Sequence, residues 1–339
     1  MTLTDPRVDA FARQFLSAAQ LSVQCDSVES DVVQLGSRAV RVTIPQANYP
    51  HGLNPLTGLR KASPNSAGQH APDFEIIFFQ NIEGARLPTA LWPSNWHFPL
   101  GQIAQSKTGR YRVSLDRHTG TVSVMDLVSR QCGIWAYEAQ KMPYWWCATP
   151  FRLQFSWIAD TFDAELVHGA AVNLLKRTSL ISGLSGAGKS TLTHFLHLEG
   201  AEIISDDFVL VEGDFVSSPY TRTKLHRKSF ELIPEFKEKA ANWKFPQEKM
   251  ILNDVSPARH GVLVLDEIVD VQKGDTARFA VASQSEVFKD LAIGTLSGVL
   301  GGNRRTLTRI SRLIRNHSCT SFTSPPSRLN ATKAWASRG

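Results

Sequence analysis

Hydrophobic and polar positions follow two different patterns along the chain, and the pattern changes near residue 165. In the first part, apolar residues at helical spacing predict an amphipathic helix over residues 8–20. Alternation with a period of two predicts strands at 37–45, at 74–80 and in a hairpin over 111–127 with "DRHTG" as its turn. Residues 1–140 are therefore predicted to form a β-rich N-terminal domain.

After residue 165, short apolar runs alternate with helical or polar stretches. These runs are "LVHGAAV", "RTSLISG", "AEIISDD" and "HGVLVLDE". Such alternation predicts an α/β domain, which we place at residues 141–325. The aromatic stretch 141–162 is interpreted as a sheet-covering helix with its lead-in, forming core between the domains. Residues 326–339 are predicted to be a loose tail, in which Leu329 and Trp335 are the candidates for docking.

The composition fits a globular protein of two domains that is large enough to bury a core. The chain has 339 residues, of which 42% are hydrophobic and 20% charged. Its net charge of +6 suits an anionic partner such as a nucleotide and does not by itself indicate nucleic acid. The four cysteines form no C-x-x-C pair, which argues against a zinc site. No signal peptide or membrane-spanning run is recognisable, so a cytoplasmic location away from membranes is expected.

The segment "GLSGAGKS", residues 183–190, fits the phosphate-loop pattern G-x-x-x-x-G-K-[ST]. A predicted strand, "TSLIS", precedes it and a predicted helix, "STLTHFLHLEG", follows it. Glycines let backbone N–H groups point at phosphate oxygens, and the helix N-terminus adds a partial positive charge. Lys189 would reach the β- and γ-phosphates, and the Ser190 hydroxyl would ligate Mg²⁺. The expected ATP-binding residues are Gly183, Ser185, Gly186, Ala187, Gly188, Lys189, Ser190 and Thr191.

Two acidic motifs compete for the place beside the γ-phosphate. Asp206 and Asp207 end "IISDD", the next apolar run after the predicted helix. Asp266 and Glu267 end "VLVLDE", a pattern typical of the second acidic motif of motor-like and transport ATPases. In a P-loop enzyme, one carboxylate holds Mg²⁺, and another activates the group that attacks the γ-phosphate.

An ordered set of motifs favours the first pair. His168 and Gly169 precede the loop strand, and the glycine loop, a helix and "SDD" follow. This set resembles the HPr kinase/phosphorylase superfamily, in particular its wider group of HPr-kinase-like P-loop kinases, over roughly residues 143–210. The E-x-R-G-x-G and P-G-R-N segments of true HPr kinases are not found, so the resemblance is to the wider group. It implies a P-loop kinase domain of the HPr-kinase/PEP-carboxykinase-like type.

The resemblance also implies roles for individual residues. Asp207 would take the proton from the acceptor hydroxyl, and Asp206 would assist through Mg²⁺ or by orienting Asp207. His168 would lie beside the phosphate pocket, although a buried histidine with a structural role also fits that position. The implied activity is transfer of the γ-phosphate of ATP to a serine-type hydroxyl on a protein, peptide or small molecule.

Other interpretations stay open at the level of sequence. A P-loop ATPase using Asp266 and Glu267 is the first alternative, and a non-enzymatic nucleotide sensor is the second. The basic stretches 222–229 and 304–315 are either solvated surface or contacts to phosphate. By elimination, the N-terminal domain is assigned to substrate selection or to contacts between subunits of a homo-oligomer.

Overall fold

The chain folds as two compact α/β units, residues 1–161 and 162–339. The computed structural model describes residues 3–4, 7–25, 27–49, 52–62, 71–80, 87–90, 102–236, 249–252, 262–299 and 303–338. We call the two parts the N-terminal and the C-terminal unit. The division falls after Thr161 and not after residue 140, because the helices formed by the aromatic stretch pack on the N-terminal sheet.

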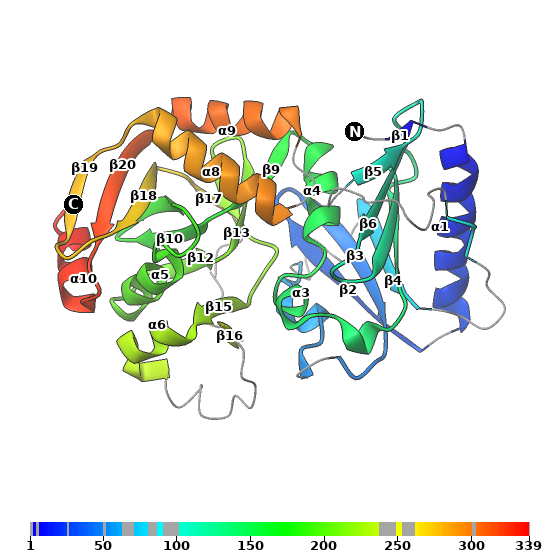
Figure 1. The fold of residues 1–339 in the computed structure, drawn as a ribbon, viewed down its shortest axis with the longest axis horizontal. Helices are drawn as coiled ribbons and strands as arrows, with labels where there is room; N and C mark the ends of the chain where they lie inside the picture. The colour runs from blue at the N-terminus through cyan, green and yellow to red at the C-terminus, as the bar shows by residue number, and fades with distance from the viewer. Residues whose placement is uncertain are drawn as a thin grey trace. The chain divides into compact units, whose positions relative to one another are not determined.

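The N-terminal unit is built on one mixed sheet with strand order β1-β5-β6-β7-β8-β4-β3-β2 (Figure 1). Its strands are β1 (Leu3–Thr4), β2 (Val28–Leu35), β3 (Arg38–Pro45), β4 (Phe74–Phe79), β5 (Gln102–Gln105), β6 (Tyr111–Asp116), β7 (Thr121–Asp126) and β8 (Gln131–Ala136). Its helices are α1 (Arg7–Cys25), α3 (Tyr144–Ala148), α4 (Arg152–Asp160) and the short turns η2 (Leu56–Gly58) and η3 (Ala139–Lys141). The predicted helix, strands and β6–β7 hairpin are confirmed, and α1 extends beyond the predicted residue 20.

Alternate residues of β4 point to opposite faces of this sheet, as the strand period requires. Ile77 and Phe79 pack under α1, whereas the ring of Phe78 contacts Trp146 and Phe151 on the other face. Figure 1 shows α1 on one face of the sheet and α3 with α4 on the other. The predicted sheet-covering role of the aromatic stretch is confirmed, and the sheet is that of the N-terminal unit.

The C-terminal unit contains a six-stranded sheet (β12-β10-β11-β18-β20-β19), a four-stranded sheet (β17-β14-β13-β9) and the pair β15-β16 among the described strands. Its strands are β9 (Ala164–His168), β10 (Ala170–Leu174), β11 (Arg177–Ser182), β12 (Glu202–Ser205), β13 (Phe208–Glu212), β14 (Phe215–Ser217), β15 (Thr223–His226), β16 (Lys249–Leu252), β17 (Val262–Val264), β18 (Glu267–Lys273), β19 (Arg278–Val281) and β20 (Ser318–Ser324). Its helices are α5 (Lys189–Leu198), α6 (Arg227–Leu232), η4 (Pro234–Phe236), α8 (Gln284–Val299), α9 (Arg304–Asn316) and α10 (Arg328–Ala336).

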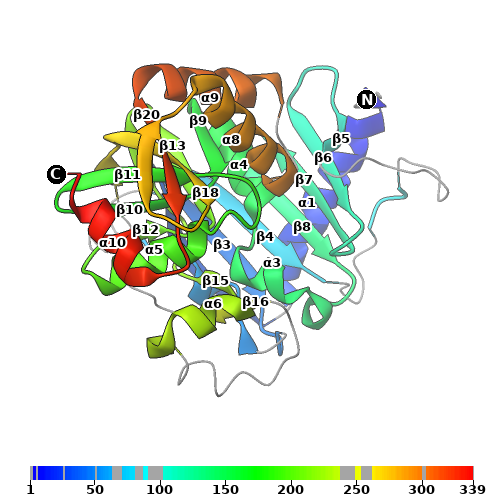
Figure 2. The ribbon, with the colours of Figure 1, turned by 60° about the vertical axis from the view of Figure 1, so that its left-hand side comes forward.

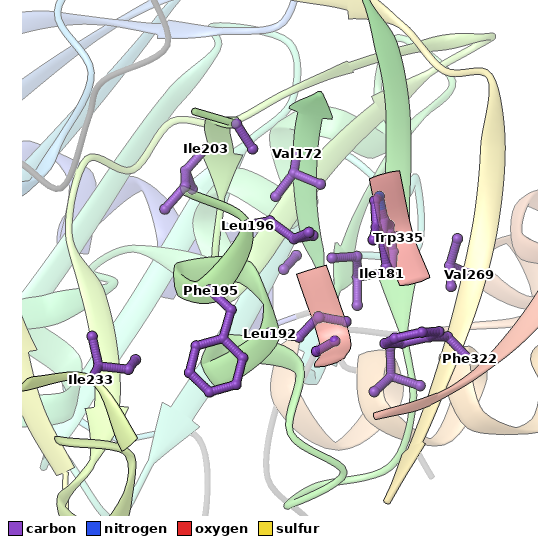
Figure 3. Packing of buried hydrophobic residues seen from close by; sticks show 14 of the residues in the cluster. Val172, Ile181, Leu192, Phe195, Leu196, Ile203, Ile233, Val269, Phe322 and Trp335 are labelled. Atoms are coloured by element: carbon purple, nitrogen blue, oxygen red, sulfur yellow. The ribbon is translucent and has the colours of Figure 1, made fainter. Parts of the chain in front are cut away.

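Helices cover both faces of the six-stranded sheet, with α8 and α9 on one side and α5 and α10 on the other (Figure 2). On the second side, Val172, Ile181 and Trp335 belong to the core formed with α5, as the gathered side chains of Figure 3 show. The intervening residues Ala171 and Leu180 belong to the opposite core. Burial on both faces explains why these strands appear in the sequence as continuous apolar runs.

Two predictions about this unit are wrong. The run "VLVLDE" is not one strand ending in acids: Val262–Val264 forms β17, and Glu267 begins β18 in a different sheet. The predicted loose tail contains helix α10, capped by the Ser327 side chain. Trp335 docks as expected, against Phe279 and Phe322, whereas Leu329 remains 56% exposed. Burial of this one large ring anchors the helix.

Across the part of the chain that the structure describes, none of the helices combines the length and the apolar character needed to cross a membrane.

Candidate functional site

The glycine-rich loop, which we define as residues 183–188, joins β11 to α5. Gly183, Gly186 and Gly188 have φ angles of +135°, +80° and +103°, which L side chains rarely adopt. At Gly183 a Cβ would also lie 2.6 Å from the carbonyl oxygen of Val271, so only glycine fits. The buried Lys189 folds back, and its Nζ donates to the Gly183 carbonyl oxygen over 2.7 Å. The loop thus has the strand–loop–helix form that its sequence pattern predicts.

The chain passes between the four-stranded and the six-stranded sheet at two neighbouring points, which we call crossings. One crossing contains His168 and Gly169, and the other contains Asp206 and Asp207. His168 ends β9 in the four-stranded sheet, and the chain continues after Gly169 into β10 of the six-stranded sheet. Asp206 and Asp207 join β12 to β13 in the opposite direction. Gly169 donates its N–H to the Asp207 carbonyl oxygen over 3.1 Å. The structure therefore brings together the two motifs that the sequence placed 38 residues apart, since 206 − 168 = 38.

Asp206 is the buried member of the pair, with 4% of its surface exposed. Its Oδ2 accepts the backbone N–H of Lys224 over 3.4 Å and lies 4.0 Å from His194 Nε2. Burial and the neighbouring Asp207 raise the pKa of Asp206 to about 7. Ser190 has the opposite, smaller effect on this pKa. Asp206 is therefore poised between its protonated and ionised forms at neutral pH.

Asp207 is more accessible and lies between two basic side chains. The exposed fraction of its side chain is 15%, its Oδ1 lies 3.5 Å from His168 Nδ1, and its Oδ2 pairs with Lys224 Nζ. Burial lowers the pKa of His168 to about 4, with Asp207 opposing the shift and Lys189 and Lys224 adding to it. His168 is consequently neutral at pH 7 and neighbours Asp207 as an uncharged imidazole.

Helix α8 fixes the position of His168 from the other side. The His168 backbone N–H donates to Thr295 Oγ1 over 3.1 Å. A Cβ at Gly294 would lie 3.1 Å from His168 Cδ2, and one at Gly298 would lie 3.1 Å from the ring of Phe208. Small residues on α8 therefore let the helix approach the crossing closely.

The Asp206 carboxylate could supply an oxygen ligand to a metal ion. Asp206 Oδ1 is buried and has no hydrogen-bond partner among the described residues. An unpaired buried carboxylate oxygen is costly unless a cation or proton satisfies it. The described residues hold no cluster of three or more His, Cys, Asp or Glu side chains suited to a metal. Mg²⁺ commonly needs only one or two carboxylates, because substrate phosphates and water complete its shell.

A cavity of about 350 Å³ adjoins the glycine-rich loop. Ala187, Gly188 and Thr191 line one part of it. The remaining lining includes Leu232 of α6, Lys273 and Asp275 after β18, and Pro325 and Pro326 after β20. This volume lies within the usual range for small-molecule sites, and the lining combines apolar surface with both signs of charge.

The competing acids, Asp266 and Glu267, lie at the wrong end of their strand. β11 and β18 are parallel, and Glu267 is level with Ser179, four residues before Gly183 at the start of the loop. That separation is roughly 13 Å along the strand. Glu267 is fully buried and accepts hydrogen bonds from Ser179, Arg177 and Arg338. These contacts indicate that Glu267 has a structural role.

Sequence reasoning missed two residues near the loop, Asp270 and His194, and left Lys224 open between solvated surface and contact with phosphate. Asp270 is level with Ser182 and accepts its hydroxyl over 2.8 Å. His194 is fully buried with Nε2 3.1 Å from Thr223 Oγ1. The side chain of Lys224 is only 11% exposed, so it is not part of a solvated surface. The sequence did contain a signal for Lys224 and Asp270. Each is a charged residue within a segment that alternates as a strand does, "TKLH" and "EIVDV".

Two arginines of the basic helix α9, Arg309 and Arg312, are paired with carboxylates away from the glycine-rich loop. Arg309 Nε and Arg312 Nη1 contact the two carboxylate oxygens of Asp163 at 2.9 Å and 2.7 Å. Arg309 also lies 3.3 Å from Glu165. These contacts attach α9 to the start of β9, which is a structural role.

Comparisons with known proteins leave the family open. No protein-family model matches the chain, and no curated protein matches it. A solved structure of the Hpr(Ser) kinase/phosphatase from Coxiella burnetii is similar over 51% of this chain and 94% of that one. The sequence identity is 12% and the TM-score is 0.26, and a match this weak does not decide what the chain does.

Proposed function

We propose that the protein is an ATP-dependent kinase that requires Mg²⁺ and phosphorylates a serine-type hydroxyl on a protein, peptide or small molecule. The observation that carries this proposal is the placement of Asp207 3.5 Å from His168, next to Asp206, whose pKa Ser190 at the start of α5 lowers against the larger effect of burial. A glycine-rich loop, its lysine and two carboxylates in one place are the parts that phosphoryl transfer needs. All of them belong to the C-terminal unit.

Asp207 is the group best placed to act as the base. As the acceptor oxygen attacks, an O–P bond forms to the γ-phosphorus, and the bond to the leaving oxygen of ADP breaks. The proton of the acceptor hydroxyl moves to the Asp207 carboxylate, which is partly exposed and so can be reached by an acceptor. The neutral His168 orients this carboxylate and brings no competing positive charge.

The remaining groups bind ATP. Lys189 Nζ would exchange its contact with the Gly183 carbonyl oxygen for the phosphates, and loop N–H groups would hold the phosphate oxygens. Asp206 and Ser190 would hold Mg²⁺, which neutralises charge on the phosphates when it is bound. The nucleoside would occupy the cavity between Thr191, Leu232 and Pro325.

The resemblance to HPr-kinase-like P-loop kinases supports the same conclusion from the ordered motifs. A role of the N-terminal unit in substrate selection or in subunit contacts belongs to this proposal. The ATPase alternative requires Glu267 near the γ-phosphate, whereas the register of β18 puts Glu267 level with Ser179 at the far end of β11.

The proposal is tested by incubating the protein with Mg²⁺, ATP labelled at the γ-phosphate and a lysate of its host. Phosphorylated products are separated and hydrolysed to identify the modified residue. Label on a hydroxyl-bearing acceptor, absent with the Asp207→Asn variant, supports the kinase. Release of inorganic phosphate alone supports an ATPase, and ATP binding without any product supports a nucleotide sensor.

A further inference from the structure

Lys224 contacts both members of the acid pair. Its backbone N–H donates to Asp206 Oδ2 over 3.4 Å, and its ammonium pairs with Asp207 Oδ2. The side chain is only 11% exposed, so the ammonium is held against the acids and is largely withdrawn from water. A single residue therefore connects the candidate metal ligand with the candidate base.

The strand that carries Lys224 is fixed relative to the glycine-rich loop. Thr223 Oγ1 lies 3.1 Å from Nε2 of His194, which belongs to the helix that follows the loop. Lys224 itself pairs with Ile251 in the antiparallel pair β15-β16. The strand that carries Lys224 is thus attached to the same helix that begins with Lys189.

Lys189 of α5 and Lys224 of β15 both lie near His168. Both ammonium groups are close enough to His168 to lower the pKa of its ring. The two lysines supply two positive charges beside the loop, which suits a polyanion. A terminal phosphate carries more charge and more acceptor oxygens than a carboxylate, so it competes well for an ammonium.

We propose that Lys224 is a catalytic residue that binds the γ-phosphate, and that it leaves Asp207 for this phosphate when ATP binds. The inference rests on the proposed function and adds a step to it. Without ATP, the ammonium occupies Oδ2 of Asp207. With ATP, the ammonium moves to the phosphate and Oδ2 becomes available for the acceptor proton. The base is thereby released only when a phosphate is present to be transferred.

This role differs measurably from a structural one. A γ-phosphate contact contributes to the affinity for a triphosphate and contributes nothing to the affinity for ADP. A lysine that only neutralises Asp207 contributes equally to both. The ratio of the two affinities therefore separates the alternatives, and it does not depend on knowing the acceptor.

The test measures, by calorimetry with Mg²⁺, binding of ADP and of a non-hydrolysable ATP analogue to the full chain. We expect Lys224→Met to weaken analogue binding by roughly tenfold to a hundredfold and ADP binding by less than about twofold. Lys224→Arg should restore part of the loss, since it keeps the charge. Lys228→Met is the matched control, because Lys228 is exposed on α6 in the same basic stretch, and it should behave as wild type.

Equal losses for both nucleotides, or no loss for either, would overturn the role of Lys224. If Lys224→Met fails to fold because Asp207 loses its partner, the double variant Lys224→Met/Asp207→Asn removes both charges and allows the same comparison. If the wild type transfers phosphate to no acceptor yet shows the Lys224-dependent preference for the triphosphate, the kinase proposal fails and the γ-phosphate contact stands.

Discussion

Gly169 donates its backbone N–H to the carbonyl oxygen of Asp207 over 3.1 Å, and this bond joins the two crossings between the sheets. One crossing carries His168 and the other carries the acid pair. The hydrogen bond holds the imidazole of one chain segment against the carboxylate of the other. The catalytic geometry that we propose is therefore a property of two backbone crossings, and changes to the backbone there should affect it.

Replacing Gly169 with alanine should disturb both folding and transfer. The new Cβ would lie 2.9 Å from the carbonyl oxygen of Ile181, which belongs to the backbone of β11 and cannot rotate away. We expect a loss of about 1–3 kcal/mol in the free energy of unfolding. Thermal and chemical unfolding measure it, and wild-type stability in this variant would show that the crossing has more room than the structure indicates.

Glu267→Gln should lower stability without trapping ATP. The buried carboxylate accepts from Ser179, Arg177 and Arg338, so loss of its charge leaves the arginines without compensation. We expect a loss of roughly 2–4 kcal/mol in the free energy of unfolding. The matched control is Asp266→Asn, whose side chain is exposed and should matter less.

Unfolding and nucleotide binding are measured on the same Glu267→Gln and Asp266→Asn samples. ATP that stays tightly bound to a stable Glu267→Gln protein would favour the ATPase alternative instead.

Stability without nucleotide or Mg²⁺ should fall as the pH rises toward neutrality. The pKa of Asp206 is raised from 3.8 to about 7, so the folded state binds a proton that the unfolded state releases between these values. The stabilising contribution of that proton is present at low pH and is lost as the pH passes through about 7.

Asp206→Asn should therefore raise the melting temperature relative to wild type at pH 8, with the difference shrinking toward pH 4. Melting curves across this range test the prediction, with the exposed Asp275→Asn as control. A variant that is less stable than wild type at pH 8 would show that Asp206 is stabilised in its charged form.

His168→Gln should reduce transfer while leaving the shape of its pH profile unchanged. The pKa of His168 is lowered to about 4, so its charge does not change between pH 5 and pH 8. Loss of the ring next to Asp207 removes orientation, which we expect to cost about tenfold in rate with little change in ATP affinity. Rates measured from pH 5 to pH 8 decide the matter. An inflection near pH 6 in wild type that disappears in the variant would indicate that His168 titrates during catalysis.

Local patterns predicted much of the fold. Alternation in β6 and β7 and the glycine pattern between β11 and α5 depend on neighbouring residues, and both are present in the structure. The placement of β18 beside β11 depends on long-range pairing, so the sequence alone suggested the wrong end for Asp266 and Glu267. Helix α10 was missed for a similar reason, because burial of Trp335 against Phe322 fixes it.

The candidate site was predicted in part. The order of His168, the glycine-rich loop and the acid pair indicated that they would meet, and the structure brings His168 within 3.5 Å of Asp207. The sequence left Lys224 open between solvated surface and contact with phosphate, because burial of a lysine in a basic stretch depends on tertiary packing, here of β15 near α5. Which of two adjacent aspartates is buried also depends on tertiary packing.

The central claim is that Asp207 takes the acceptor proton during phosphate transfer. The most direct measurement compares wild type and Asp207→Asn in a single turnover with γ-labelled ATP and the acceptor identified from the lysate, alongside ATP affinity for both proteins. The account predicts at least about a hundredfold slower transfer by Asp207→Asn, with ATP affinity unchanged within about threefold. Transfer by Asp207→Asn at the wild-type rate would contradict it.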